Sequence, residues 1–150
     1  MELHEFSAYE IHRMLLERKV SAVEVATAFL ERIAQVDGRP GTLDTGELTA
    51  DDLAKVHSFI TLTPERALEQ ARRVDERLAA GETPGILAGV PFTVKDIFCV
   101  EGVPATAASR ILANFQAPYT ATPVSRMEAA GGLMLGKVNL DEFTYGSSNE

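Results

Sequence analysis

The sequence predicts an α/β fold in which N-terminal helices are followed by part of a mixed sheet layered with helices. Two observations carry this prediction. Apolar residues recur at helical spacing in several stretches, and short apolar runs of strand length stand between the later ones. Helices that alternate with short apolar strands are typical of a layered sheet with some parallel pairing.

Two helices are expected first, each with its own start signal. Ser7 with Glu10, and Ser21 with Glu24, have capping-box spacing, in which the hydroxyl accepts a free N–H and the carboxylate reaches back. The glycine and proline within 37–40 end the second helix. The apolar stripes of these helices consist of Ile11, Met14 and Leu15, and of Val23, Ala26, Leu30 and Ile33.

The middle of the chain is expected to hold a loop, a strand and a third long helix. Residues 38–49 contain few large apolar residues and suit a surface loop, with a short helix over 49–56. The β-branched run 58–63 fits a short buried strand. Pro64 suits the first turn of the next helix, which Gly81 ends. The core face of that helix consists of Ala67, Ala71, Val74 and Leu78.

Two apolar runs in the second half of the chain suit strands. Residues 86–98 form the first and residues 133–138 the second, and both are expected to be buried. A helix over 122–130 lies between them, with Pro123 in its first turn. Gly131-Gly132 closes that helix.

Composition excludes several classes of function. The net charge of -8 argues against a dedicated nucleic-acid surface, which would be a basic patch. The single cysteine, Cys99, excludes an intrachain disulfide, suits a cytoplasmic protein and is expected to be a small buried residue. The N-terminus lacks signal-peptide features, and no apolar run approaches membrane-spanning length. His4, His12 and His57 lack metal-ligand spacing and are interpreted as structural or surface residues.

Lys95 is the residue with the clearest chemical potential. It stands among apolar neighbours near the end of a predicted strand. Burial disfavours the ammonium form, so a lysine there loses its proton more readily than a surface lysine and can act as a general base or nucleophile. Local sequence leaves an alternative open, in which Lys95 pairs with Asp96 or extends to the surface.

The stretch 136–149 is the second candidate, because ligand sites in α/β sheets gather at the carboxyl ends of strands. Gly146 with the serines that follow can bring main-chain amides close to a ligand, and an ordinary turn is the alternative. Asp141 and Glu142 are adjacent and would point apart on an extended segment. They are therefore interpreted as a helix N-terminus or a solvated turn.

Taken together and in this order, these stretches resemble two landmarks of the amidase-signature family. They are Gly89-Val-Pro-Phe-Thr-Val-Lys-Asp96 and Gly136-Lys-Val-Asn-Leu-Asp-Glu-Phe143. The helix start at 21–25 also resembles this family, and segment 38–54 resembles a surface insertion. The resemblance implies that residues 1–150 are the N-terminal portion of a single amidase domain, and so an incomplete amidase-signature fold.

The resemblance also implies a mechanism. The family uses a Ser–cis-Ser–Lys triad, in which a neutral lysine, here Lys95, takes a proton through a bridging serine from the nucleophilic serine. The family's two serine tracts do not occur in this sequence, so Ser147 and Ser148 receive no triad role, and these residues alone are expected to be inactive. The resemblance instead places Thr144, Tyr145, Gly146 and Ser147 along the substrate pocket.

Within the family, residues 139–150 most resemble the A subunits of tRNA-dependent amidotransferases. Such subunits hydrolyse the side-chain amide of glutamine and pass ammonia to a B subunit, which uses ATP and Mg²⁺ to amidate misacylated Glu-tRNA(Gln) or Asp-tRNA(Asn). A small C subunit completes the complex, and no cofactor or metal is implied for this chain. Two alternatives remain open: a stand-alone amidase acting on small amides, and a non-catalytic α/β interaction module.

Overall fold

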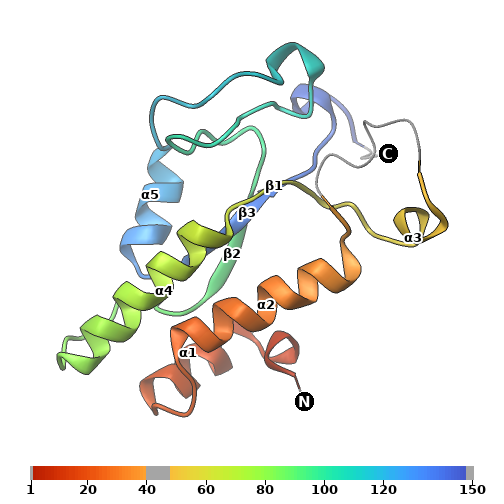
Figure 1. Ribbon diagram of the computed structural model, residues 1–150. Coiled ribbons are helices and arrows are strands. Elements are labelled where there is room, and N and C mark those ends of the chain that lie inside the picture. The colour runs from red at the N-terminus through yellow and green to blue at the C-terminus, as the bar shows by residue number, and fades with distance from the viewer. Residues whose placement is uncertain (1, 40–47, 148–150) are drawn as a thin grey trace. The chain divides into compact units, whose positions relative to one another are not determined.

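The computed structural model describes residues 2–39 and 48–147, along which helices and short strands alternate (Figure 1). This confirms the predicted α/β class. No helix in these two ranges is long and apolar enough to cross a membrane. The strands are β1 (Phe59–Leu62), β2 (Pro91–Lys95) and β3 (Leu133–Val138). The α-helices are α1 (Ala8–Leu16), α2 (Ala22–Val36), α3 (Ala50–Leu53), α4 (Pro64–Ala79) and α5 (Thr122–Ala129), and the short 3-10 helices are η1 (Leu3–Glu5), η3 (Arg110–Leu112) and η4 (Glu142–Thr144).

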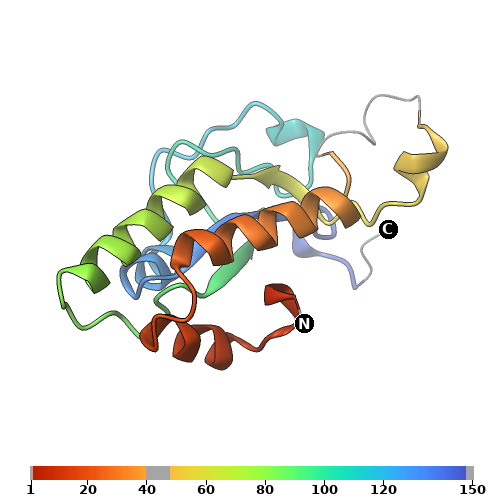
Figure 2. The same ribbon diagram turned by 60° about the horizontal axis from the view of Figure 1, so that its bottom comes forward.

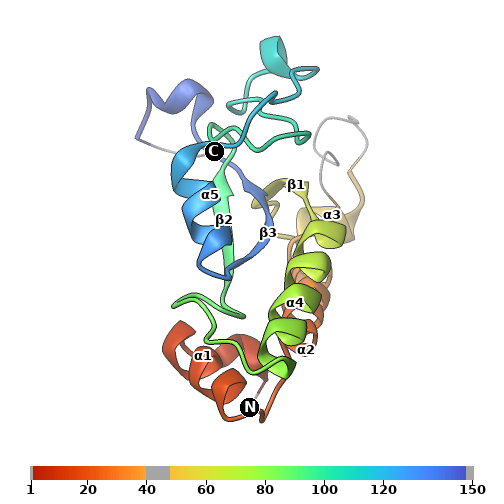
Figure 3. The ribbon, with the colours of Figure 1, turned by 90° about the vertical axis from the view of Figure 1, so that its left-hand side faces the viewer.

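The three strands form one sheet in the order β1-β3-β2, so β3 is the central strand (Figure 3). β1 runs antiparallel to β3, with Thr61 opposite Lys137 and Leu62 opposite Gly136. The missing side chain of Gly136 makes this pairing possible, because a Cβ there would overlap the main-chain oxygen of Thr61. β3 is buried along nearly its whole length, as predicted.

β2 runs parallel to β3, which confirms the expected mixed sheet. The Leu133 N–H donates to the Val90 carbonyl at 2.9 Å, and the Asp96 N–H donates to the Val138 carbonyl at 3.0 Å. The two strands therefore advance in the same direction. As outer strands, β1 and β2 are only partly buried, so the prediction that both would be buried is wrong.

The chain forms two compact units, of which the first comprises Met1–Arg32, Thr63–Phe92 and Ser125–Leu135. Its core is made mainly of small side chains, which allow helices to approach closely. The core residues are Leu15, Ala22, Ala26, Ala71, Val74, Ala88 and Leu133, with Val23, Leu68 and Leu78 packed against them. The predicted core faces of α1 and α4 are confirmed, as is most of the stripe on α2.

Both predicted capping boxes form, and Figure 2 shows the short connection that leads from α1 into α2 between them. The Glu10 N–H donates to the Ser7 hydroxyl at 3.3 Å, and the Ser7 N–H donates to the Glu10 carboxylate at 2.8 Å. The corresponding distances for Glu24 and Ser21 are 3.1 and 2.8 Å. The serine N–H groups, and then the hydroxyls, hold the pKa of the Glu10 and Glu24 carboxyls below its ordinary value.

Two long-range contacts fix the start of α2 within the first unit. The Asp75 carboxylate of α4 accepts the N–H groups of Ala22 and Val23 at 2.7 and 3.1 Å. A carboxylate at this position also interacts favourably with the helix dipole. The Arg18 guanidinium, in the turn between α1 and α2, donates to the Leu78 carbonyl at 3.0 Å.

The second unit comprises Ile33–Leu62, Thr93–Val124 and Gly136–Glu150. α2 ends at Val36, as its glycine signal predicts, and the buried Asp37 follows. The Asp37 carboxylate accepts the N–H groups of Ser58 and Phe59 at 2.7 and 3.0 Å, which ties the end of α2 to the start of β1. After β2, the chain folds back on itself through a bridge between Pro104 and Gln116.

The middle of the predicted insertion at 38–54, residues 40–47, lies outside the described residues. Its described end forms α3, a single turn capped by Thr49, which is shorter than the helix predicted over 49–56. The cap is sound: the Asp52 N–H donates to the Thr49 hydroxyl at 3.1 Å. The helix stops there because the N–H groups of Val56 and His57 donate to the carbonyls of Val36 and Asp37, at 3.0 and 2.9 Å, and do not continue the helix.

Candidate active site

Lys95 is the last residue of β2, and its side chain is exposed. Side chains alternate between faces along a strand, and here Val94 and Asp96 are buried while Thr93 and Lys95 are not. In the part of the chain that the structure describes, the expectation that Lys95 is buried among apolar neighbours is therefore wrong. The sequence left two alternatives to burial, a pair with Asp96 and extension to the surface, and the structure confirms the second.

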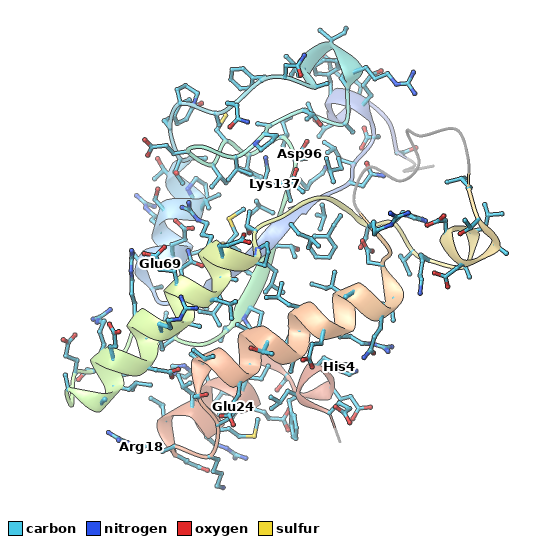
Figure 4. The ribbon with its side chains drawn as sticks, in the orientation of Figure 1. His4, Arg18, Glu24, Glu69, Asp96 and Lys137 are labelled. Carbon is cyan, nitrogen blue, oxygen red and sulfur yellow. The ribbon has the colours of Figure 1, made fainter. Side chains whose placement is uncertain are left out.

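The other alternative, a Lys95–Asp96 pair, is wrong because Asp96 pairs with Lys137 of β3. The Lys137 Nζ lies 2.8 Å from the Asp96 Oδ1, and both side chains are completely buried. The two labelled side chains lie next to each other in Figure 4. Asp96 neutralises the Lys137 charge, and a second N–H of the Lys137 ammonium donates to the Pro104 carbonyl at 2.8 Å.

Asp96 holds the loop that follows β2 against the sheet. Its Oδ2 accepts the main-chain N–H of Thr106 at 2.8 Å and also the Thr106 hydroxyl. Its main-chain carbonyl accepts the Ala107 N–H at 3.2 Å, and its main-chain N–H donates to the Val138 carbonyl at 3.0 Å. The end of β2 is thus bonded on one side to β3 and on the other to Thr106 and Ala107.

The bonds that Asp96 makes to Lys137, Thr106, Ala107 and Val138 are called the anchor below. Ala107 connects this anchor to the candidate pocket segment 144–147. While its N–H donates to Asp96, its carbonyl accepts the Phe143 N–H at 3.0 Å. Ala107 and Phe143 both have positive φ angles, 50° and 53°, and Thr144 follows at 61°. Left-handed backbone at non-glycine residues is costly and persists only where surrounding bonds enforce it.

The predicted pocket residues lie together at the end of η4 and in the exposed segment that follows it. Thr144, Tyr145, Gly146 and Ser147 are all exposed, and Tyr145 is 93% exposed. Asp141 precedes η4 as its N-cap residue, which confirms its interpretation as the start of a helical turn. The Asp141 carboxylate also accepts the Gly146 N–H, which closes the loop on itself.

A shallow cavity in the second unit is lined by none of the predicted site residues. It measures about 440 Å³ and includes Thr61, Thr106, Ser109 and Asn139 among the residues that line it. Of these, Thr106 also bonds to Asp96. The cavity therefore borders the anchor and does not contain Lys95.

The remaining candidate residues have structural partners. The His12 Nδ1 lies 3.0 Å from the Ala88 carbonyl, and the His57 Nε2 lies 2.6 Å from the Asp52 carbonyl. In the part of the chain that the structure describes, no three metal-ligating side chains gather. Cys99 is half-buried where a buried residue was expected, and its thiol raises the pKa of the neighbouring Tyr119 hydroxyl.

Sequence reasoning missed Lys137, although a signal was present. The predicted strand 133–138 is apolar except for this one lysine, and a lysine inside a buried strand requires a counter-ion. The sequence does not show which carboxylate supplies it. Asp96 becomes the partner only because β2 and β3 are neighbours in the sheet.

The sequence and the fold are both similar to those of amidases. A family model described as Amidase matches residues 49–150. The A subunits of two glutamyl-tRNA(Gln) amidotransferases are similar along nearly the whole chain. That of Moorella thermoacetica is 45% identical over 150 residues, which is 100% of this chain and 28% of that protein. That of Thermosynechococcus vestitus is 45% identical over 141 residues, or 94% of this chain and 26% of that protein. The chain thus spans about a quarter of the length of these relatives.

Solved amidase structures contain the same arrangement of elements. The peptide amidase of Stenotrophomonas maltophilia matches with a TM-score of 0.77 and 27% identity, over 93% of this chain and 26% of that one. A structure described as a vestigial protein complex that reveals the origins of an s-triazine catabolic enzyme matches with a TM-score of 0.81 and 34% identity, over 94% and 28% of the two chains. The predicted incomplete amidase-signature fold is confirmed.

Proposed function

The chain belongs to the amidase-signature family, and we propose that the protein carrying it hydrolyses the side-chain amide of glutamine to supply ammonia for tRNA-dependent amidation. One observation carries this proposal. The two amidotransferase relatives are 45% identical across nearly the whole chain, whereas the solved peptide amidase is 27% identical over a similar span. Both the motif around Lys95 and residues 144–147 lie within the family match and within the match to the Moorella thermoacetica subunit.

In the proposed reaction, Lys95 is the base of a Ser–cis-Ser–Lys triad. The neutral amine accepts a proton through the bridging serine, and the nucleophilic serine attacks the glutamine amide carbon. The C–N bond breaks, ammonia leaves with that proton, and water then hydrolyses the acyl-enzyme. Two features of the structure support this role: Lys95 ends a strand, and its neighbour Asp96 is paired with Lys137 and so does not pair with the Lys95 amine.

The proposed glutamine pocket includes the loop Thr144–Ser147. This loop is exposed and closed on itself by the Asp141–Gly146 bond, and it follows β3 at the carboxyl end of that strand. The proposed partners are a B subunit, which uses ATP and Mg²⁺, and a small C subunit. Misacylated tRNA would be bound through the partner, which agrees with the net charge of -8 on this chain.

A stand-alone amidase is the second candidate, because the fold is shared with enzymes of that kind. The peptide amidase and a bacterial aryl acylamidase match with TM-scores of 0.77 and 0.75. The backbone of these residues therefore suits amide hydrolysis in general. The choice of amide depends on the pocket.

The test is ammonia release by a full-length protein that contains this sequence. Glutamine, asparagine and a C-terminal peptide amide are compared as substrates, each with and without the B and C subunits. We expect release from glutamine that increases when the partners, ATP, Mg²⁺ and misacylated tRNA are present. Release from the peptide amide alone, unaffected by the partners, would establish the stand-alone amidase instead.

A further inference from the structure

We propose that Asp96 and Lys137 are positioning residues for Lys95. Their buried ion pair fixes the end of β2, so that the Lys95 side chain leaves the sheet in one orientation. This inference rests on the proposed function, because only a catalytic Lys95 requires such an orientation. Neither residue is proposed to contact the substrate.

The first step is the geometry of consecutive strand residues. Lys95 and Asp96 are adjacent, and the strand sends the first side chain outward and the second inward. They share a peptide unit, so whatever fixes the backbone of Asp96 also fixes the direction in which Lys95 departs. The buried residue can therefore orient the exposed one without touching its amine.

The second step is the set of bonds that Asp96 makes. Its carboxylate is held by the Lys137 ammonium at 2.8 Å and by the Thr106 N–H at 2.8 Å. Its main chain is bonded to Val138 on one side and to Ala107 on the other, at 3.0 and 3.2 Å. Side chain and backbone are thus fixed together, which leaves little rotation at the end of β2.

The third step is the link to the proposed pocket. The same residue, Ala107, bonds to Asp96 through its N–H and to Phe143 through its carbonyl. The positive φ angles of Ala107 and Phe143 show that this junction is held against its local preference. The anchor therefore sets the end of β2 and the start of the 144–147 loop in one arrangement.

The fourth step concerns why an ion pair stands here. Compared with apolar residues of equal volume, a buried ion pair adds little net stability, because both charges lose their hydration. The ion pair instead fixes orientation. The bonds from Lys137 to the Pro104 carbonyl and from the Thr106 N–H to Asp96 are charge-assisted and hold only in a narrow geometry. This suits a positioning role better than a role in stability alone.

The matched variants are Thr106→Val and Thr106→Ser in a full-length protein that contains this sequence. Valine keeps the shape and the main-chain N–H but loses the hydroxyl bond to Asp96, whereas serine keeps that bond. We expect Thr106→Val to lower kcat for glutamine by about 10-fold with KM within about 3-fold, and Thr106→Ser to retain kcat, since small displacements of a catalytic group reduce the rate strongly. Equal kcat in both variants and the wild type would overturn the proposal.

The stronger change is Asp96→Asn/Lys137→Met, which removes both charges together. We expect a loss of about 100-fold in kcat with KM within about 3-fold. The control is Asp75→Asn, which weakens the start of α2 in the other unit and should lower the melting temperature without that loss. Wild-type kcat in the folded double variant, or a change in KM alone, contradicts a positioning role.

Amide hydrogen exchange tests the anchor independently of activity. In the double variant, the Ala107 amide should exchange at least about 10-fold faster than in the wild type, because its acceptor is no longer held. Unchanged exchange overturns the anchor even if the double variant is inactive. Full activity of Lys95→Ala overturns the proposed base and the positioning role together, whereas an inactive Lys95→Ala with fully active Thr106 and Asp96 variants overturns only the positioning role.

Discussion

The Lys137 ammonium lies 2.8 Å from the Asp96 carboxylate, with both side chains fully buried. Lys19 and Glu17 form a pair of nearly the same length, 2.7 Å, but their side chains are 66% and 42% exposed. The chain thus contains one exposed and one buried pair of a lysine with a carboxylate. Water screens the exposed pair, whereas neither side chain of the buried pair has solvent-accessible surface, so the two pairs should respond differently to loss of the lysine.

Lys137→Met should destabilise the protein by about 3 to 5 kcal/mol, because it leaves the Asp96 carboxylate buried without its counter-ion. Lys19→Met is the matched control and should cost less than about 1 kcal/mol, since exposed pairs contribute little. Urea unfolding of both variants measures the difference. Equal losses of stability would mean that the Asp96–Lys137 pair is hydrated in solution.

Gly136→Ala should separate β1 from β3. A Cβ at this position would overlap the Thr61 main-chain oxygen and lie 3.1 Å from the Leu62 Cα, so the backbone must move. We expect a loss of about 3 kcal/mol, the upper end of the usual cost of overpacking. Gly102→Ala is the control, with no atom within 4 Å of its Cβ and a φ of +75°, and should cost about 1 kcal/mol. Thermal unfolding that ranks the two in the opposite order would contradict the register of β1 on β3.

Glu24→Gln should lose stability in a pH-dependent way. The Ser21 N–H and hydroxyl hold the pKa of the folded Glu24 carboxyl below its ordinary value. A lowered folded pKa stabilises the protein fully above the unfolded value, and this contribution disappears as the pH falls through the folded value. The urea midpoint of the wild type should therefore exceed that of Glu24→Gln at pH 7, by a margin that narrows toward pH 3. A margin that stays constant over this range would show that the carboxylate charge has no part in the cap.

The helices of this chain could be predicted from sequence because their signals are local. Ser7 and Ser21 mark helix starts together with a glutamate three residues later, and Pro64 marks a start by itself. The structure confirms all three starts. The central strand β3 could be predicted because its apolar run is short and directly follows Gly131-Gly132. α3 is shorter than predicted because Val56 and His57 bond to Val36 and Asp37, which are distant in sequence.

The site could be predicted only in part, because its decisive contacts connect distant residues. Lys95 was singled out from its motif, but its exposure follows from β2 being an outer strand, which no local pattern reveals. The partner of Asp96 is fixed by the pairing of β2 with β3. The bonds of Ala107 to Asp96 and Phe143 join three separate segments and leave no signal in the sequence.

The central claim is that Lys95 is the catalytic base, and the most direct test is the glutaminase rate of Lys95→Ala in a full-length protein that contains this sequence. A general base contributes about 10² to 10⁴ in rate, so we expect kcat to fall by at least 100-fold while the melting temperature, for this exposed side chain, stays close to that of the wild type. Glutamine hydrolysis at the wild-type rate by a folded Lys95→Ala protein would contradict the claim.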